Sequence, residues 1–336
     1  MMEAEGVAAA RFRPHRFAKA AATGPGLDRA GARPPGGRLT AMTSPAAPVG
    51  PLAILGPGTL GLAAAAWAAE RGIHARLAGR DSAHAEEGLA RIHARWRRRV
   101  ERIRLAEAAR VEAAHHLRAC SSVDEALDGA GAVLEALPEH LEAKRAAWGR
   151  IHAAAGPAVL LLTGTSSLSL ASLRQGIAAP GRILGFHLFL PLEHMRALEL
   201  VSEPGTDPRW VAAAEALGQE LGRTVFRVQD GSGFAASRMA LAQGLEAIRL
   251  LEAGVASAET LDGLMVHGYG HPMGPLELSD RIGLDLRLDI CRGLHAATSD
   301  PRFAPPGLLV SLVQDGALGR KAGRGFHRWD DRGNRR

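Results

Sequence analysis

At 336 residues, of which 46% are hydrophobic, the chain is long enough for two domains and a sizeable buried core. Its formal net charge is +6, but only 4% of residues are aromatic and no basic-aromatic interleaving suggests a stacking platform, which argues against a nucleic-acid partner. Two cysteines, Cys120 and Cys291, exclude a disulfide framework and fit a reducing cytoplasm. The longest apolar runs, such as 62–69, are much shorter than the ~18 residues of a membrane-spanning helix, so we expect no membrane partner.

Residues 1–49 are rich in Ala, Arg, Pro and Gly, and the breakers at 24–26 and 34–37 interrupt any hydrophobic periodicity. We therefore predict a disordered tail. The segment has some likeness to an arginine-rich organelle transit peptide, but a start site placed too far upstream explains it as well, because Met42 lies just before the first strand signal.

The first ordered unit has the pattern of a strand, a glycine turn and a helix. An apolar run at 51–55 leads into Gly56-x-Gly58-x-x-Gly61, and an alanine-rich run at 62–70 follows. The first glycine permits a tight turn, the second lets the backbone approach a pyrophosphate, and the third lets the helix pack closely on the sheet. The helix N-terminus offers N–H groups and a positive dipole to the phosphates. The pattern predicts a dinucleotide site formed by Gly56, Gly58, Thr59, Leu60 and Gly61.

A second predicted strand, 73–78, ends at Gly79-Arg80-Asp81. About 20 residues beyond the glycines, a carboxylate normally takes the adenosine ribose hydroxyls, and Gly79 occupies that position here. Because no carboxylate repels a 2′-phosphate there, the Arg80 guanidinium could bind that phosphate in a forked geometry. This favours NADP over NAD. The alternative is that Asp81, two positions on, does the carboxylate's work.

Two further apolar runs deliver polar residues to the ends of predicted strands. The run 158–163 leads into Thr165-Ser166-Ser167, and the run 182–186 leads into His187. Strand ends of this kind open into the ligand crevice of a doubly wound sheet. Oxidation of an alcohol by a nicotinamide needs a base at the hydroxyl, a task that suits imidazole, and a carboxylate behind the ring fixes its tautomer. Taken alone, a histidine at a strand end is more often a hydrogen-bonded structural residue.

The order and spacing of these motifs resemble those of the 3-hydroxyacyl-CoA dehydrogenase family over about residues 51–330. The blocks that carry the resemblance are the glycine turn, 134–139 with Lys144, Thr165-Ser166-Ser167, His187-x-Phe189-x-Pro191, Met195-x-x-Leu198-Glu199, 246–252, 270–285 and 319–326. The resemblance implies a Rossmann-type doubly wound α/β sheet followed by an all-α C-terminal domain. It also implies reversible oxidation of a (3S)-3-hydroxyacyl-CoA to the 3-oxoacyl-CoA, a reaction of fatty acid metabolism, with hydride going to NAD(P) and the proton to His187.

The same resemblance implies roles for individual residues. His187 and Glu199 match the catalytic pair, and Ser166 matches a serine that binds near the substrate hydroxyl and the nicotinamide. The family's cofactor contacts are matched by Glu139, Lys144 and Lys321. Without the resemblance, a surface ion pair and a turn cation would explain these three residues better.

Two positions depart from the family pattern. The family has asparagine at the positions of Leu190 and Ser237. In the family, the first asparagine contacts the cofactor and the second helps polarise the substrate carbonyl. Ser237 keeps a hydroxyl donor with shorter reach, and one weakened oxyanion donor costs on the order of 10²-fold in rate. Two alternatives follow: a dehydrogenase of a CoA-free 3-hydroxy acid, similar to gulonate or carnitine dehydrogenase, and a cofactor-binding protein with impaired catalysis. Retention of His187, Glu199 and Ser166 argues against the second.

The domain organisation follows from a change of periodicity near Gly233. We predict the tail at 1–49, a dinucleotide-binding domain at 50–230, a helical substrate and dimerisation domain at 231–330, and a short tail at 331–336. The helical pattern begins with an apolar stripe of Leu241, Leu245, Ile248 and Leu251. By resemblance this domain closes over the substrate and forms a homodimer interface, although plain core explains the stripe equally well. The block 268–285, dense in Gly and Pro, is predicted to be a loop that lines the pocket.

Two other clusters contain residue types that can bind ligands. His115-His116 lies near Cys120 but has no second spaced pair of ligands, so we predict no metal site. The arginine-rich stretch 91–104 lies on a predicted helix, where a solvated face and a contact to the CoA phosphates both remain open.

Overall fold

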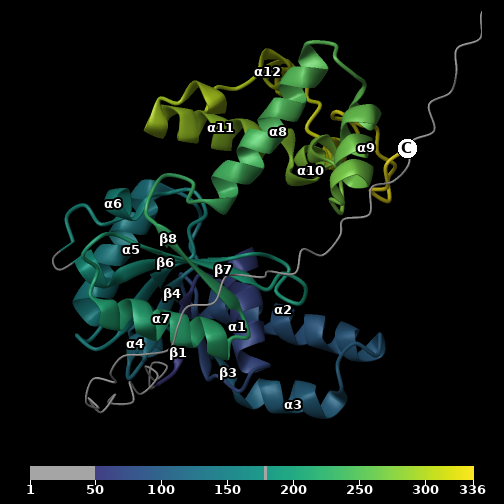
Figure 1. Cartoon of the computed structure of the whole chain (residues 1–336). Helices are drawn as coiled ribbons and strands as arrows, with labels where there is room; N and C mark the ends of the chain where they lie inside the picture. The colour runs from purple at the N-terminus through teal and green to yellow at the C-terminus, as the bar shows by residue number, and fades with distance from the viewer. Residues whose placement is uncertain (1–49, 178–179) are drawn as a thin grey trace, which may run out of the picture. The chain divides into compact units, whose positions relative to one another are not determined.

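The computed structural model describes residues 50–177 and 180–336, so the predicted tail at 1–49 lies outside the described residues. Eight strands form one sheet in the order β3-β2-β1-β4-β5-β6-β7-β8 (Figure 1). All neighbours pair in parallel except β6 and β7. The strands are β1 (Leu52–Leu55), β2 (Ala75–Ala78), β3 (Leu117–Cys120), β4 (Ala132–Glu135), β5 (Leu160–Thr163), β6 (Ile183–Leu188), β7 (Ala197–Ser202) and β8 (Thr224–Gln229). Strand order reverses between β1 and β4, which confirms the predicted doubly wound sheet and marks the edge where such folds bind ligands.

Helices cover both faces of the sheet because its strands are apolar on both sides. Along β1, Leu52 and Ile54 join one core cluster, whereas Ala53 and Leu55 join the other. The first cluster includes residues of α1 (Thr59–Ala69), α2 (Ser82–Glu101), α3 (Glu107–His115) and α7 (Pro208–Glu220). The second includes residues of α4 (Val123–Leu127) and α5 (Leu141–Ala154).

Two predicted strands begin two residues later than expected. The amide of Ile73 donates to the carbonyl of Ala68, which closes the end of α1, so the ladder of β2 starts only at Ala75. The amide of Val159 likewise donates to Gly156 in a turn, and β5 starts at Leu160. Local turn bonds therefore compete with the sheet for these backbone groups.

The chain after β8 is helical, as predicted. Its helices are α8 (Ala236–Glu252), α9 (Ala258–Tyr269), α10 (Pro275–Ile282), α11 (Leu284–Thr298) and α12 (Gly307–Gln314). Leu241, Leu245 and Ile248 of the predicted stripe are buried in its core. Within residues 50–177 and 180–336, no helix is long and apolar enough to cross a membrane.

The prediction of a loop at 268–285 was wrong for most of that block. α9 runs to Tyr269 and α10 begins at Pro275, so only a short connection is not helical. α10 forms despite the Gly and Pro residues because a carboxylate from α9 caps it: the Asp262 oxygens accept the N–H groups of Leu276 and Glu277.

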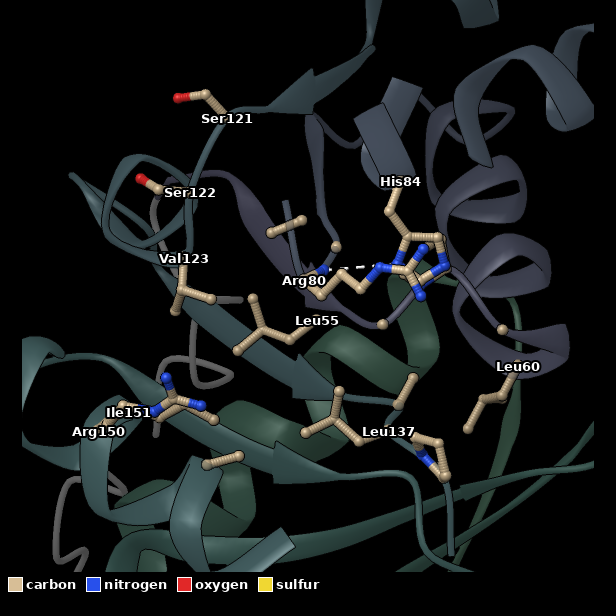
Figure 2. Close-up of a pocket in the computed structure, with 18 of the residues that line it drawn as sticks. Leu55, Leu60, Arg80, His84, Ser121, Ser122, Val123, Leu137, Arg150 and Ile151 are labelled. Carbon is tan, nitrogen blue, oxygen red and sulfur yellow. Dashed lines mark hydrogen bonds between the residues drawn. The ribbon is translucent and has the colours of Figure 1, made fainter. Parts of the chain in front are cut away.

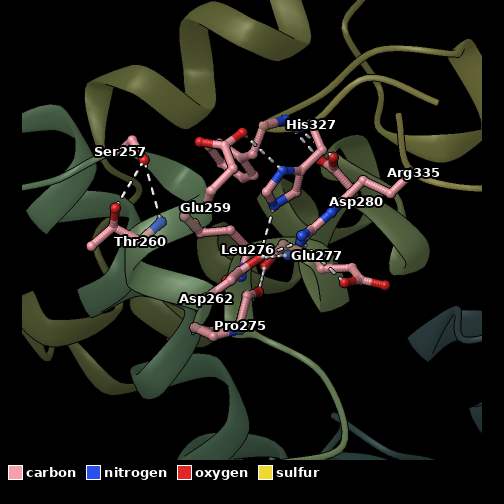
Figure 3. Close-up of polar contacts among 12 residues, drawn as sticks. Ser257, Glu259, Thr260, Asp262, Pro275, Leu276, Glu277, Asp280, His327 and Arg335 are labelled. Carbon is pink, nitrogen blue, oxygen red and sulfur yellow. Dashed lines mark hydrogen bonds and ion pairs between the residues drawn. The ribbon is translucent and has the colours of Figure 1, made fainter. Parts of the chain in front are cut away.

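Two glycine-containing blocks of the helical part, 270–285 and 319–326, pack against each other. Asp280 accepts hydrogen bonds from the amides of Phe326 and His327 and from the Trp329 indole (Figure 3). Burial raises the pKa of the Asp280 carboxyl. A Cβ on Gly325 would lie 2.0 Å from Asp280 Oδ1, so only glycine fits there. His327 Nε2 lies 2.8 Å from the Asp262 carboxylate, which joins the same segment to α9.

Candidate active site

The glycine turn after β1 has the geometry that a dinucleotide needs. Gly56 adopts a φ of +109°, and a Cβ on Gly61 would lie 1.9 Å from the Gly56 carbonyl oxygen. Among the described residues, no side chain caps the N-terminus of α1 at Gly58. The first N–H groups of the helix, at Thr59 and Leu60, are therefore available to an anion such as a pyrophosphate.

A cavity of about 1090 Å³ opens beside this turn (Figure 2). Six of the predicted cofactor residues line it: Gly56, Gly58, Thr59, Leu60, Gly79 and Arg80. Arg91, which the sequence offered only as a contact to the CoA phosphates, also lines it. Sequence reasoning missed the rest of its polar wall, namely His84, Ser121, Ser122, Asp124 and Arg150. Apolar side chains such as Val123, Leu137 and Ile151 complete the lining. An apolar slot with polar groups, beside a glycine turn and a free helix N-terminus, fits an adenine dinucleotide.

The end of β2 shows what surrounds the adenosine side of that cavity. Asp81 caps α2, because its Oδ1 accepts the amide of His84 at 2.8 Å, while its Oδ2 lies 3.3 Å from Arg80 Nε. The cap and the Arg80 contact lower the pKa of Asp81. The Arg80 amide donates to His84 Nδ1 at 3.4 Å, so Arg80 and His84 lie next to each other at the rim. A Cβ on Gly79 would meet His84 and Ala85 atoms at 3.0 Å, which leaves little room for a side chain.

His187 and Glu199 face each other across two antiparallel strands. They are register partners in β6 and β7, and Nδ1 of the imidazole lies 2.6 Å from Glu199 Oε2. Both residues are buried, and the ring of Phe189 lies 4.5 Å from the imidazole. The contact at Nδ1 leaves Nε2 as the nitrogen that can exchange a proton with a ligand.

The other carboxylate oxygen of Glu199, Oε1, binds the start of α8. It accepts the amides of Ala235 and Ala236 at 3.2 and 2.8 Å. Burial opposes ionisation of this carboxyl, but the bonds from His187, Ala236 and Ala235 outweigh it and hold its pKa below the ordinary value. Glu199 is therefore an anion that orients the imidazole and can stabilise its protonated form.

Ser166 lies in a turn after β5 that Glu139 organises. Glu139 Oε1 accepts the Thr165 hydroxyl at 2.6 Å, the amides of Ser166 and Ser167 at 3.0 Å, and the Ser167 hydroxyl at 2.8 Å. In the part of the chain that the structure describes, the Ser166 hydroxyl has no hydrogen-bond partner. It can therefore bind a ligand while its backbone is held in place.

The remaining predicted residues lie apart from the cavity. Lys144 is buried in α5, within 3.4 Å of Glu139 Oε2. Leu190 follows β6 and is partly exposed, and Ser237 is the second residue of α8. Lys321 forms an ion pair with Asp285 at 2.5 Å. Among residues 50–177 and 180–336, no group of three or more His, Cys, Asp or Glu side chains is placed to hold a metal ion.

Comparisons with known proteins identify the family of the chain. Family models described as 3-hydroxyacyl-CoA dehydrogenase, NAD binding domain, and 3-hydroxyacyl-CoA dehydrogenase, C-terminal domain, match residues 51–231 and 233–329. A probable 3-hydroxybutyryl-CoA dehydrogenase of Bacillus subtilis is 32% identical over 279 residues, 83% of this chain and 97% of the relative. A 3-hydroxybutyryl-CoA dehydrogenase of Bradyrhizobium diazoefficiens is 33% identical over 282 residues, 84% and 96% of the two chains. The crystal structure of (S)-3-hydroxybutyryl-CoA dehydrogenase from Ralstonia eutropha superposes with a TM-score of 0.79 and 31% identity, covering 83% of this chain and 99% of that one. The chain belongs to the 3-hydroxyacyl-CoA dehydrogenase family.

Proposed function

We propose that this protein interconverts (3S)-3-hydroxyacyl-CoA and 3-oxoacyl-CoA with NAD(P) as hydride carrier. The observation that carries the proposal is the His187–Glu199 contact of 2.6 Å near the carboxyl end of β6. Because β6 runs parallel to β5, β4 and β1, its carboxyl end lies on the same sheet edge as the glycine turn. Base and cofactor turn therefore share one edge.

The residues of this edge supply the proton chemistry. His187 Nε2 accepts the proton of the substrate hydroxyl, while Glu199 stabilises the imidazolium that forms. Ser166 donates its hydroxyl to the substrate oxygen, and Ser237 donates to the thioester carbonyl. When bound, the nicotinamide ring supplies the hydride acceptor.

For the cofactor, NADP is favoured over NAD. Arg80, His84 and Arg91 line the same cavity as Gly79 and supply positive or hydrogen-bonding groups for a 2′-phosphate. The competing carboxylate, Asp81, is engaged by the His84 amide and by Arg80, which disfavours its use as a ribose ligand. The cofactor roles of Glu139, Lys144, Leu190 and Lys321 remain part of the proposal by family resemblance.

The enzyme is further proposed to be a homodimer formed by the helical part. Large apolar side chains are exposed on α8, α10 and α11, namely Met239, Leu278, Ile282 and Leu286. A partner surface would remove them from water. Light scattering coupled to size-exclusion chromatography measures the mass directly, and a homodimer should give twice the mass of one 35.3 kDa chain. Both cysteines are free and buried, which fits the reducing cytoplasm where we expect the enzyme.

The direct test of the reaction uses the two enantiomers of one substrate. (3S)-3-hydroxybutyryl-CoA with NADP or NAD should give reduced cofactor and acetoacetyl-CoA, and the (3R) thioester serves as the matched control. Turnover of the (3S) compound alone is the expected result. Absence of turnover with either enantiomer and either cofactor would contradict the proposal.

A further inference from the structure

A chain of three charged side chains lies beneath the Ser166 turn. Glu135, the last residue of β4, and Lys144, in α5, have side chains that are 0% and 1% exposed. Lys144 Nζ lies 2.7 Å from Glu135 Oε1 and 3.4 Å from Glu139 Oε2. Glu139, at the other end, is partly exposed and accepts the hydrogen bonds of the Ser166 turn. Charged groups thus run from the buried end of β4 to that turn, and only Glu139 is partly exposed.

The ammonium of Lys144 has three protein partners. It donates hydrogen bonds to Glu135 Oε1 at 2.7 Å and to the Leu137 carbonyl at 3.1 Å. It also forms an ion pair with Glu139 Oε2 at 3.4 Å. A buried ammonium with these three partners links Glu135 to Glu139.

Both carboxylate oxygens of Glu135 accept hydrogen bonds, and their partners lie in α5, in the connection after β4 and in β5. Its Oε1 also accepts the Leu137 amide at 2.7 Å, and its Oε2 accepts the Thr163 hydroxyl at 2.7 Å. Glu135 and Thr163 are register partners in β4 and β5. The carboxylate therefore fixes the start of the β4–α5 connection to the end of β5.

We infer that Glu135 is a positioning residue of the active site, which acts through Lys144 and Glu139 to hold the Ser166 turn. The inference rests on the proposed function, since it gives Ser166 its role at the substrate hydroxyl. Glu135 fixes the ammonium, the ammonium fixes Glu139, and Glu139 fixes the backbone of residues 165–167.

The electrostatics of the array support coupling between its ends. Burial opposes ionisation of Glu139, but the charge of Lys144 and the bonds from Thr165, Ser167 and Ser166 outweigh burial and hold its pKa below the ordinary value. In a buried network each bond strengthens its neighbours, and one missing partner leaves a charge uncompensated. A change at Glu135 is therefore expected to reach the turn.

The test compares Glu135→Gln with Glu142→Gln, an exposed carboxylate of α5 that serves as matched control. Glu135→Gln keeps the shape and removes the charge. Three quantities are measured on the full chain: amide hydrogen exchange at residues 165–168, the Kd of NADH and NADPH, and kcat with acetoacetyl-CoA. We expect faster exchange at Ser166 and Ser167 and a kcat lower by about 10- to 100-fold, because small misplacements cost that much. Any change in cofactor Kd should be too small to account for the loss of kcat, because Lys144 and Glu139 keep their side chains.

Three results would overturn the inference. Exchange at Ser166 and Ser167 equal to that of the control would show that Glu135 does not hold the turn. A lower unfolding temperature with unchanged kcat would reduce Glu135 to a stabilising residue. A rise in cofactor Kd that accounts for the whole loss of activity would show that Glu135 supports cofactor binding and not the position of Ser166.

Two safeguards keep the test decisive. If Glu135→Gln does not fold, Thr163→Val removes one hydrogen bond to Glu135 Oε2 and should change exchange and kcat in the same direction to a smaller degree. If the parent turns over no acyl-CoA, the proposed function fails, while the exchange measurement still decides whether Glu135 holds the turn.

Discussion

His187 is the residue on which the chemistry depends. Its Nδ1 is engaged by Glu199 at 2.6 Å, so the proton must be exchanged at Nε2. His187→Gln should lower kcat by roughly 10²-fold or more, since an amide cannot act as a base. Steady-state kinetics and a cofactor titration check this, with cofactor binding expected to be retained. Turnover within a few-fold of the parent would refute the assignment.

Gly79 and Arg80 determine the expected cofactor preference. Arg80 is 79% exposed, so its attraction for a 2′-phosphate is screened, and we expect a preference for NADPH of roughly tenfold or less. Arg80→Ala should remove the preference. Gly79→Asp should reverse it, and combining it with His84→Ala should strengthen the reversal, because the alanine removes the His84 Nδ1 that a Cβ at position 79 would meet at 3.0 Å.

The measurement is kcat/KM for NADH and NADPH in the parent and in each variant. A preference of the parent for NADH that disappears in Asp81→Ala would contradict the role of Arg80. It would mean that Asp81 leaves its cap on α2 to bind the ribose.

Leu190 and Ser237 are the positions where the chain departs from the family it belongs to. Leu190→Asn or Ser237→Asn should raise turnover of acetoacetyl-CoA by restoring an amide donor, and a recovered oxyanion donor is worth up to on the order of 10²-fold. Initial rates of the two variants and the parent measure this. Lower rates in both variants would indicate a pocket built for another 3-hydroxy compound.

At the scale of elements, Glu199 joins β7 both to β6 and to the first turn of α8. It contacts His187 through one oxygen and the amides of Ala235 and Ala236 through the other. Since its pKa is lowered in the folded state, the unfolded chain binds more protons when the pH falls below about 4.5. The stabilisation is therefore complete above the unfolded pKa and is lost as the pH falls through the folded pKa.

Glu199→Gln tests this pH dependence of stability. The substitution should lower the free energy of unfolding by about 1–3 kcal/mol at neutral pH, the range for hydrogen bonds to a charged group. The difference from the parent should shrink as the pH falls below 4.5, the ordinary value for this carboxyl. Urea unfolding of both proteins across this pH range measures it. A difference that does not depend on pH would contradict the ionic role of Glu199.

At the scale of the whole molecule, the elements with a strong local signal could be predicted from the sequence. The glycine turn, the doubly wound sheet and the helical C-terminal part are examples, because periodicity and turn residues encode them locally. The helix α10 was not predicted, since its cap comes from Asp262, fourteen residues before Leu276. Glycine and proline counts in 268–285 indicated a loop where a distant carboxylate allows a helix to start.

In the site, too, the sequence points only to residues that carry a local or family signal. His187 stands out because it follows a predicted apolar run, and the family pattern points to both His187 and Glu199. His84, Arg150 and Ser122 line the cavity beside the glycine turn, but they come from α2, α5 and the connection before α4. Only the folded sheet brings these segments to one edge. Glu135 carried no signal, because a carboxylate at the end of an apolar strand has many possible partners until β4, β5 and α5 are packed together.

The most direct test of the whole account is a comparison of acetoacetyl-CoA with free acetoacetate as substrates of the parent enzyme. If the protein is a 3-hydroxyacyl-CoA dehydrogenase, kcat/KM for the thioester should exceed that for the free acid by orders of magnitude, and His187→Gln should abolish most of the thioester activity. Turnover of the free acid without turnover of the thioester would contradict the account and point to a dehydrogenase of CoA-free 3-hydroxy acids.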